Sequence, residues 1–238
     1  MKFETDVLKH HNRKRLCLIG LSVMLACFVL ITAYTLANDL PGGFSDQRRS
    51  HITGLKSTIR IPLGKTPVDA VQKFRHFPTM QIVYKEVVKD GELIFIKRFY
   101  QKEGTDLQIE FVRKTWFGWK WVWGGGFGIA NLSATIGLDY AVMPKINGIY
   151  TPFPMVYGEL FNPSISKIMI ITNGQNPGVF SAQLKGSNNE NKMIWFAFLP
   201  ESVTTPFEIE AHNAKGDIVA RKKVYDLNGY GEIEIGGP

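Results

Sequence analysis

The chain has 238 residues, with 28 Lys and Arg against 21 Asp and Glu, and a formal net charge of +7 at pH 7. Beyond residue 37 the balance falls to 23 basic and 19 acidic residues, a net of +4. These basic residues are scattered, which argues against a nucleic-acid-binding protein. Both cysteines, Cys17 and Cys27, lie in an apolar run, so the rest of the chain has no disulfide framework, thiolate nucleophile or cysteine zinc site.

The N-terminus is dominated by that run, which covers residues 16–37 without a single charge. At about 1.5 Å rise per residue, a helix of this length spans roughly 33 Å, enough to cross the hydrocarbon core of a bilayer. We therefore predict a single transmembrane helix over residues 16–37.

Basic residues on the two sides of the run predict its orientation. The first ones after it are Arg48 and Arg49, whereas the N-terminal flank holds five: Lys2, Lys9, Arg13, Lys14 and Arg15. Because positive flanks tend to stay in the cytoplasm, residues 1–15 are predicted to be a cytoplasmic tail and the C-terminal portion to be exported.

Two other interpretations of the run remain open. It could be a signal peptide cleaved after Ala37, although it is longer than the usual 7–15-residue apolar region. It could instead be a lipoprotein signal acylated at Cys27, although residues 28–37 stay apolar where lipoproteins usually become polar. All three interpretations export residues 38–238.

The first exported block is predicted to be a small α+β domain. A Gly- and Pro-rich linker over residues 38–50 precedes it, and residues 57–62 are expected to form a short strand. Thr66 can cap a helix that runs to about Phe77, since Pro and Asp follow it in the first turn. Four period-two segments then predict an antiparallel meander, with a turn at Asp90-Gly91: residues 80–89, 92–100, 106–115 and 119–123.

The second block is predicted to be an immunoglobulin-like β-sandwich. Residues 127–150 show no clear period and are interpreted as a connection plus a first strand. Short strands then recur between Gly-, Asn- and Pro-rich turns, and Trp195 is a candidate core aromatic. The predicted strands are residues 155–160, 167–172, 179–185, 193–199, 207–211 and 218–225. The predicted domain boundaries are 51–140 for the α+β domain and 141–238 for the sandwich.

Four of the five tryptophans lie within eight residues: Trp116, Trp119, Trp121 and Trp123. In a strand, the last three would share one face. That stripe is expected either to fill the core between sheet and helix or, alternatively, to form an exposed aromatic platform for a sugar chain, a peptide or the membrane interface. These four residues are the candidate ligand-binding residues.

Other residue types give no strong signal of chemistry. His51, His76 and His212 lack metal-ligand spacing and are expected to be exposed surface histidines. The Gly-rich run at residues 124–128 lacks the Lys-Ser/Thr of a phosphate-binding loop. No catalytic residue, metal site or cofactor is predicted.

The segments 90–97, 111–115 and 118–125 resemble a group of uncharacterised exported proteins of Gram-positive, spore-forming bacteria. The resemblance covers roughly residues 67–126 and centres on the pattern K-T-x-x-G-W-K-W-V-x-G-G. Members of that group carry an N-terminal membrane anchor or lipoprotein signal, so the resemblance implies a cell-envelope location. It transfers no catalytic or binding residue.

The leading hypothesis is a membrane-anchored, non-enzymatic binding or assembly module of the cell envelope, with an envelope protein or cell-wall polymer as partner and no nucleic acid. A cell-wall-directed hydrolase is the runner-up. A third hypothesis is an envelope regulator whose short cytoplasmic tail contacts a partner.

Overall fold

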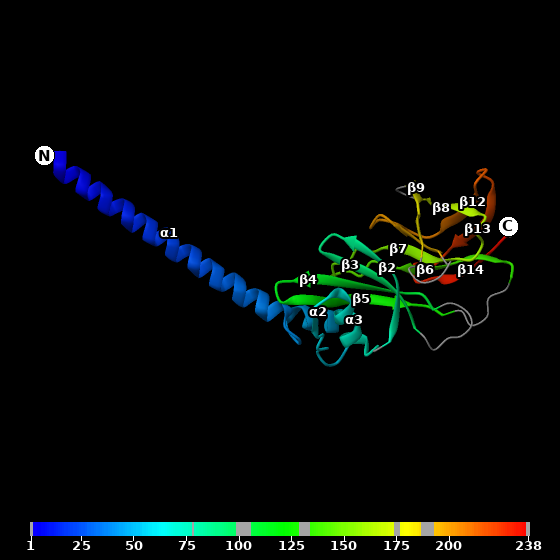
Figure 1. The fold of residues 1–238 in the computed structure, drawn as a ribbon, viewed down its shortest axis with the longest axis horizontal. Helices are drawn as coiled ribbons and strands as arrows, with labels where there is room; N and C mark the ends of the chain where they lie inside the picture. Colours follow the sequence, from blue (N-terminus) through cyan, green and yellow to red (C-terminus); the bar gives the residue numbers. More distant parts are fainter. Residues whose placement is uncertain are drawn as a thin grey trace. The chain divides into compact units, whose positions relative to one another are not determined.

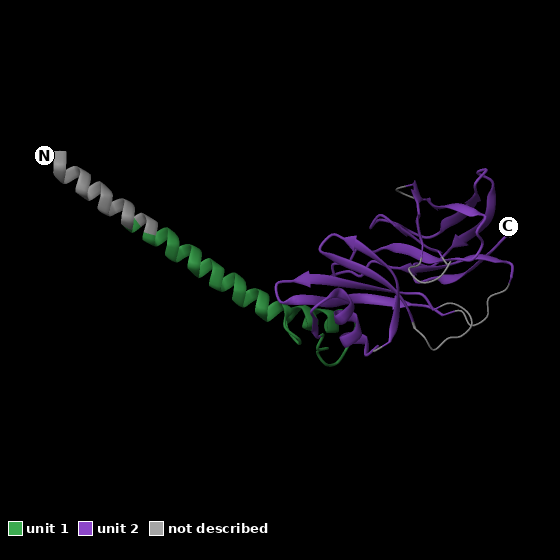
Figure 2. Cartoon of the chain, viewed as in Figure 1, with its two compact units in different colours: residues 1–61 green, residues 62–238 purple. Residues whose placement is uncertain are grey.

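The computed structural model describes residues 2–77, 79–98, 106–128, 134–173, 177–186 and 193–236. The chain divides into two compact units, residues 1–61 and residues 62–238 (Figure 2). The described part of the first unit contains two helices, and that of the second consists mostly of antiparallel strands (Figure 1). This confirms the predicted order of a long apolar helix followed by β-rich structure.

In the first unit, α1 (Lys2–Asp39) is one continuous helix through both the predicted tail and the predicted span. Its apolar side chains are exposed: Leu21, Leu25 and Leu30 are 62%, 63% and 69% exposed. Leaving such side chains in water costs about 25 cal/mol per Å² of apolar surface. The described residues hold one helix that is long and apolar enough to cross a bilayer, which is consistent with an anchor or a signal sequence.

The predicted linker, residues 38–50, contains most of a second helix, α2 (Phe44–Ile52). Asp46, in its first turn, is fully buried, and its Oδ2 accepts the backbone N–H of Gly42 at 2.8 Å. The carboxylate therefore satisfies a backbone donor just before the helix, where negative charge is favourable. Composition alone predicted a linker without a helix of its own, but the polar side chains of this stretch organise the backbone around α2.

The predicted short strand over residues 57–62 is wrong, because no strand is present there. The N–H of Ile59 donates to Ser50 Oγ at 2.8 Å, and the N–H of Ile61 donates to Asp46 Oδ2 at 3.0 Å. These α2 side chains bind two N–H groups that a strand would give to a neighbouring strand. The first strand, β1 (Leu63–Gly64), begins directly afterwards.

In the second unit, β1 is followed by the predicted helix, α3 (Pro67–Arg75). Thr66 Oγ1 accepts the N–H of Asp69 at 3.1 Å, as a helix cap does. His76 ends the helix in the left-handed conformation, with φ of 55°. α3 contacts β1, β4 and β5, and therefore covers one face of the first sheet.

The first sheet confirms the predicted meander. Its five strands run antiparallel in the order β1-β5-β4-β3-β2. The bounds of the four long strands are β2 (Met80–Val88), β3 (Gly91–Arg98), β4 (Gln108–Thr115) and β5 (Gly118–Gly126). Asp90, in the β2–β3 turn, has a φ of 63°, which Asp tolerates better than most residues.

The second sheet has the order β10-β11-β7-β6-β14 and the third has the order β13-β12-β8-β9. The second contains β6 (Ile136–Met143), β7 (Met155–Leu160), β10 (Gln183–Gly186), β11 (Met193–Phe198) and β14 (Tyr230–Glu234). The third contains β8 (Ile165–Thr172), β9 (Gly178–Ser181), β12 (Phe207–Asn213) and β13 (Ile218–Val224). The strand predicted over residues 179–185 is in fact two strands, β9 and β10, which belong to different sheets. β14 was not predicted.

The second sheet is buried on both faces. On one face Ala141, Tyr157 and Phe196 pack against the first sheet, in a core that also contains Phe95 and Phe111. The other face packs against the third sheet. Because β6 and β7 are buried along their whole length, neither alternates between apolar and polar residues. The predicted boundary between residues 140 and 141 falls inside β6, and the division into two domains stays a prediction.

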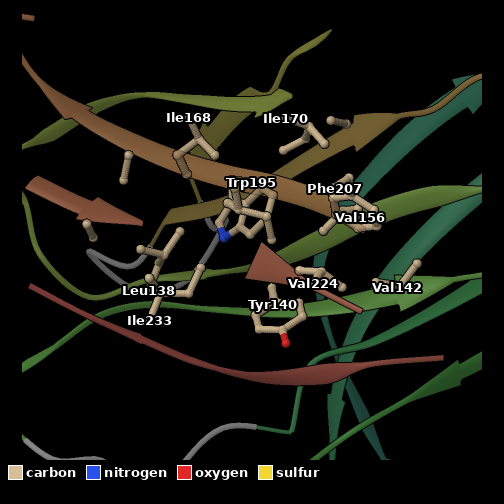
Figure 3. Close-up of a cluster of buried hydrophobic side chains, with 14 of the residues drawn as sticks. Leu138, Tyr140, Val142, Val156, Ile168, Ile170, Trp195, Phe207, Val224 and Ile233 are labelled. Carbon is tan, nitrogen blue, oxygen red and sulfur yellow. The ribbon is translucent and has the colours of Figure 1, made fainter. Parts of the chain in front are cut away.

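Trp195 lies at the centre of the core between the second and third sheets (Figure 3). It is fully buried, as the sequence predicted, and Ile168, Leu138 and Phe207 surround it. Its Nε1–H donates to the backbone oxygen of Asp139 at 3.0 Å, which satisfies the one polar group of the ring.

Candidate functional site

The tryptophan-rich segment forms the β4–β5 hairpin, and its two-residue turn is Trp116-Phe117. We call these two residues the aromatic tip; Trp116 is 64% exposed and Phe117 is 39% exposed. Thr115 holds the turn, because its Oγ1 accepts the N–H of Phe117 at 3.2 Å and donates to the oxygen of Gly118 at 2.9 Å. Gly118 has a φ of 133°, and a Cβ there would lie 2.5 Å from the Gly64 oxygen, so only glycine fits.

The other three tryptophans are not equivalent. Trp119 is half-buried, with Lys114 Nζ 6.0 Å from its ring centre, and Trp121 is only 5% exposed. A β-bulge pairs Val112 with Trp121 but Phe111 with Trp123, so Val122 is an extra residue. The bulge interrupts the alternation on which the predicted shared face rested, but the Trp121 and Trp123 rings still stack, with 6.4 Å between centroids. Trp123 also packs against the core between the first and second sheets.

Trp121 belongs to a buried polar cluster beneath α3. Its ring stacks on Phe74 at 3.9 Å between centroids, and its Nε1–H donates to Glu110 Oε2 at 2.5 Å. Glu110 is fully buried. Arg75, the last residue of α3, donates from Nε to Oε1 at 2.9 Å and from Nη2 to Oε2 at 3.1 Å, and its guanidinium lies 5.0 Å from the Trp121 ring centre. We call Arg75, Glu110 and Trp121 the Glu110 cluster.

The Glu110 cluster connects the C-terminal end of α3 to the first sheet through hydrogen bonds. Arg75 Nη2 also donates to the backbone oxygen of Gly124 at 2.8 Å. A Cβ at Gly124 would lie 2.0 Å from Glu110 Oε2, so glycine is needed for the carboxylate to fit. The Glu110 carboxylate thus accepts three hydrogen bonds, two of them from a cation, which offsets the cost of burying its charge.

A second buried polar cluster joins the first sheet to the second. Lys97 Nζ on β3 donates to Glu159 Oε2 on β7 at 2.7 Å, and the Glu159 side chain is 1% exposed. The N–H of Glu159 donates to Asp139 Oδ1 on β6 at 2.5 Å. We call Lys97, Asp139 and Glu159 the Asp139 cluster.

The Asp139 carboxylate replaces part of the β6–β7 ladder. Leu138 pairs with Leu160 and Ala141 with Tyr157, and the ladder is interrupted between these two pairs. A Cβ on Gly158 would lie 2.0 Å from the Asp139 backbone oxygen and 2.6 Å from Oδ1. Burial, together with the nearby charges of Asp139 and Glu110, raises the pKa of Tyr157 far above its usual value, so its hydroxyl stays neutral.

The sequence did not reveal the Asp139 cluster. Lys97 and Glu159 are 62 residues apart, and neither belongs to a motif. A signal was nevertheless present, because Asp139 and Glu159 are single acids inside otherwise apolar strands. Acids at fully buried strand positions must be paired or hydrogen-bonded.

The histidine predictions are correct for two of three. His51 and His76 are exposed. His212 is not, because its side chain lies 3.2 Å from Glu210 Oε2 and 3.1 Å from the Gly216 oxygen, and the residue is 8% exposed. Among the residues that the structure describes, no three His, Cys, Asp or Glu side chains are grouped as metal ligands would be.

Comparisons with protein-family models, with curated proteins and with solved structures found no match.

Proposed function

We propose that α1 is retained as a single-pass signal anchor, with the N-terminus in the cytoplasm and residues 38–238 outside it, and that the β-rich unit is a binding or assembly module of the cell envelope. The observation that carries the proposal is the long run of exposed apolar side chains on α1. In hydrocarbon each Leu, Ile, Phe or Val near the centre of such a helix is favourable by roughly 0.3–0.6 kcal/mol.

The charges that flank α1 support the orientation. Five basic residues precede the apolar run, and the first two after it are Arg48 and Arg49. Arg49 is buried, and its Nη1 lies 3.9 Å from Asp46 Oδ1, so the nearest positive charges on that side are partly balanced. The excess of positive charge therefore lies on the N-terminal side, which favours a cytoplasmic N-terminus.

We also propose that the second and third sheets form an immunoglobulin-like sandwich. Strands β6, β7, β8, β10, β11, β12 and β13 can be assigned the letters A to G in chain order, with β9 as C′. The sheet orders then become D-E-B-A and G-F-C-C′, which agree with the ABED and CFG sheets of that fold. β14 is an addition beside strand A, and Trp195 lies on strand E rather than on strand C.

The aromatic tip is the part of the tryptophan segment best placed to contact a partner. Trp116 is exposed, whereas Trp121 is buried, stacks on Phe74 and donates a hydrogen bond to Glu110. Exposed aromatic side chains are enriched where proteins bind other molecules. We therefore assign partner binding to Trp116 with Phe117, and a packing role to Trp121 and Trp123.

Anchoring and orientation can be tested on the full chain carrying an epitope tag after Pro238. Carbonate-washed membranes should retain the protein at full length, because α1 stays attached. Protease added outside wall-stripped cells should destroy the tag while a cytoplasmic marker survives. Release by carbonate, or a tag protected until lysis, would contradict the proposal.

Binding can be tested by passing the detergent-solubilised full chain over isolated cell-wall and membrane fractions. Trp116→Ala should reduce retention, while Tyr225→Ala, which removes a 70% exposed ring beside the third sheet, should not. No retention above that of an unrelated protein would contradict a binding role.

A further inference from the structure

One end of the first sheet combines exposed aromatic rings with exposed lysines. We propose that this end is a lipid-binding surface, in which the aromatic tip enters the headgroup region of a membrane rich in anionic lipid and the surrounding lysines contact lipid phosphates. The inference rests on the proposed function, because it requires that α1 keep the chain at a membrane.

The register places the relevant segments at the same end of the sheet. The β4–β5 turn is the aromatic tip, and the β2–β3 turn, Lys89-Asp90, adjoins it through the N–H of Lys114, which donates to the Asp90 oxygen at 3.1 Å. β1 reaches this end at Gly64, which pairs with Trp119, and Lys65 follows. Three chain segments thus bring Lys65, Lys89 and Lys114 to the end that carries the tip.

The exposure of these side chains matches a membrane-surface contact. Trp116 and Phe117 are exposed in the turn, and Val87, which precedes the neighbouring turn, is 81% exposed. Trp is enriched at membrane–water interfaces because its ring is apolar and its N–H is polar. Lys65, Lys89 and Lys114 are all exposed, and lysine can place an apolar stem on lipid while its ammonium reaches phosphate.

The acidic residues near this end leave a positive balance. Asp90 is exposed in the turn, and Asp69 Oδ2 is already engaged by the N–H of Lys65 at 2.7 Å and by Lys73 Nζ at 2.9 Å. Glu92 lies 3.8 Å from Lys85 Nζ. Anionic headgroups therefore meet more unbalanced cations than anions here, which gives attraction over roughly one Debye length.

The covalent connection favours lipid over a soluble partner. The chain enters the second unit through β1, whose residues pair with Lys120 and Trp119 close to the tip. A retained α1 holds the unit within a short tether of a bilayer, so a weak lipid contact would be populated by effective concentration alone. A soluble ligand would have no such advantage.

The test uses the full chain in proteoliposomes that contain lipids brominated near the headgroup, which quench nearby tryptophan fluorescence. All five tryptophans lie beyond residue 115, so any quenching reports on the second unit and not on α1. We expect quenching in anionic vesicles. Trp116→Ala should remove most of it, since Trp121 and Trp195 are buried.

A charge-reversal variant keeps every ring. Lys65→Glu, Lys89→Glu and Lys114→Glu together should shift the docking equilibrium by about fivefold or more per lysine and abolish most of the quenching. The matched control, Lys167→Glu, Lys215→Glu and Lys222→Glu, reverses three exposed lysines of the third sheet and its β12–β13 turn, and should leave quenching unchanged. The near-ultraviolet circular dichroism of the buried tryptophans verifies that each variant is folded.

Three results would overturn the inference: no quenching of the wild-type protein, equal quenching in neutral and anionic vesicles, or equal loss with the control lysines. Carbonate extraction of the same vesicles distinguishes a missing lipid contact of the second unit from a missing membrane anchor. A protein that stays embedded but is not quenched lacks the lipid contact, whereas a protein that is extracted lacks the anchor.

Discussion

Arg75 and Glu110 form a two-bond ion pair, with Nε–Oε1 and Nη2–Oε2 distances of 2.9 and 3.1 Å, between the last turn of α3 and the beginning of β4. The carboxylate is fully buried and also accepts the indole N–H of Trp121. Side chains from two other elements, α3 and β5, thus converge on one carboxyl group of β4. For this reason Trp121, from the middle of the tryptophan-rich segment, is part of the packing of α3 against the sheet.

Removing Arg75 should strongly destabilise the second unit. Arg75→Met leaves a buried carboxylate without its cation, which typically costs about 3–5 kcal/mol. The free energy of unfolding of the full chain in detergent, measured by denaturant titration, would show this. Lys73→Met is the control, because the Lys73–Asp69 pair is partly exposed and contributes less than about 1 kcal/mol. Equal losses in the two variants would contradict the structural role of the Glu110 cluster.

Trp121 and Trp116 should respond differently to the same substitution. Trp121→Phe removes the N–H that binds Glu110 and part of a stacked ring, and should cost about 1–3 kcal/mol of unfolding free energy. Trp116→Phe changes an exposed turn residue and should stay within about 0.5 kcal/mol. If Trp116 proved the more sensitive of the two, the assignment of packing to Trp121 and exposure to Trp116 would be reversed.

Gly158 should not tolerate a methyl group. The Cβ of Gly158→Ala would lie 2.0 Å from the Asp139 oxygen, so β6 and β7 would have to separate, at a cost of about 1–3 kcal/mol. Gly186→Ala is the matched control, since nothing lies within 4 Å of a Cβ there. The midpoints of thermal unfolding of the two variants give the comparison. A normal midpoint for Gly158→Ala would mean that the strands are not held this closely.

Asp69 should contribute to stability at neutral pH but not in acid. The backbone N–H of Lys65, followed by Lys73, lowers the pKa of Asp69. A carboxyl group with a lower pKa in the folded state stabilises the protein above its unfolded value, about 4, and loses this contribution as the pH falls through the folded pKa. Asp69→Asn should therefore lower the unfolding midpoint at about pH 6, and the deficit should be smaller at about pH 3. A deficit of equal size at both pH values would show that the charge is not responsible.

Four of the five strands of the first sheet, β2 to β5, could be predicted from the sequence, because they show a period of two and Asp90-Gly91 marks a turn. A strand was expected within residues 127–150, but the bounds of β6 could not be predicted, since β6 is buried on both faces and its residues do not alternate. The sequence also did not show that the chain passes from the third sheet to the second between β9 and β10. Two consecutive strands with similar residues look like one strand. The strand prediction for residues 57–62 failed for another reason. The backbone N–H groups of Ile59 and Ile61 donate hydrogen bonds to the side chains of Ser50 and Asp46 and not to a neighbouring strand.

The candidate site was only partly predictable. The sequence identified the tryptophan segment but not the bulge at Val122, which depends on the pairing of β5 with β4. Nor could it pair Glu110 with Arg75 or Lys97 with Glu159, because each contact joins residues more than 30 positions apart. Single acids within apolar strands were the available clue, and they identify positions that need a partner without naming it.

The central claim is that α1 places residues 38–238 across a membrane from the N-terminus. Its most direct test is a pair of fusions to the full chain after Pro238, one to a reporter enzyme that is active only after export and one to a reporter that is active only in the cytoplasm. The account predicts activity of the exported reporter and silence of the other. Activity of the cytoplasmic reporter alone would contradict it.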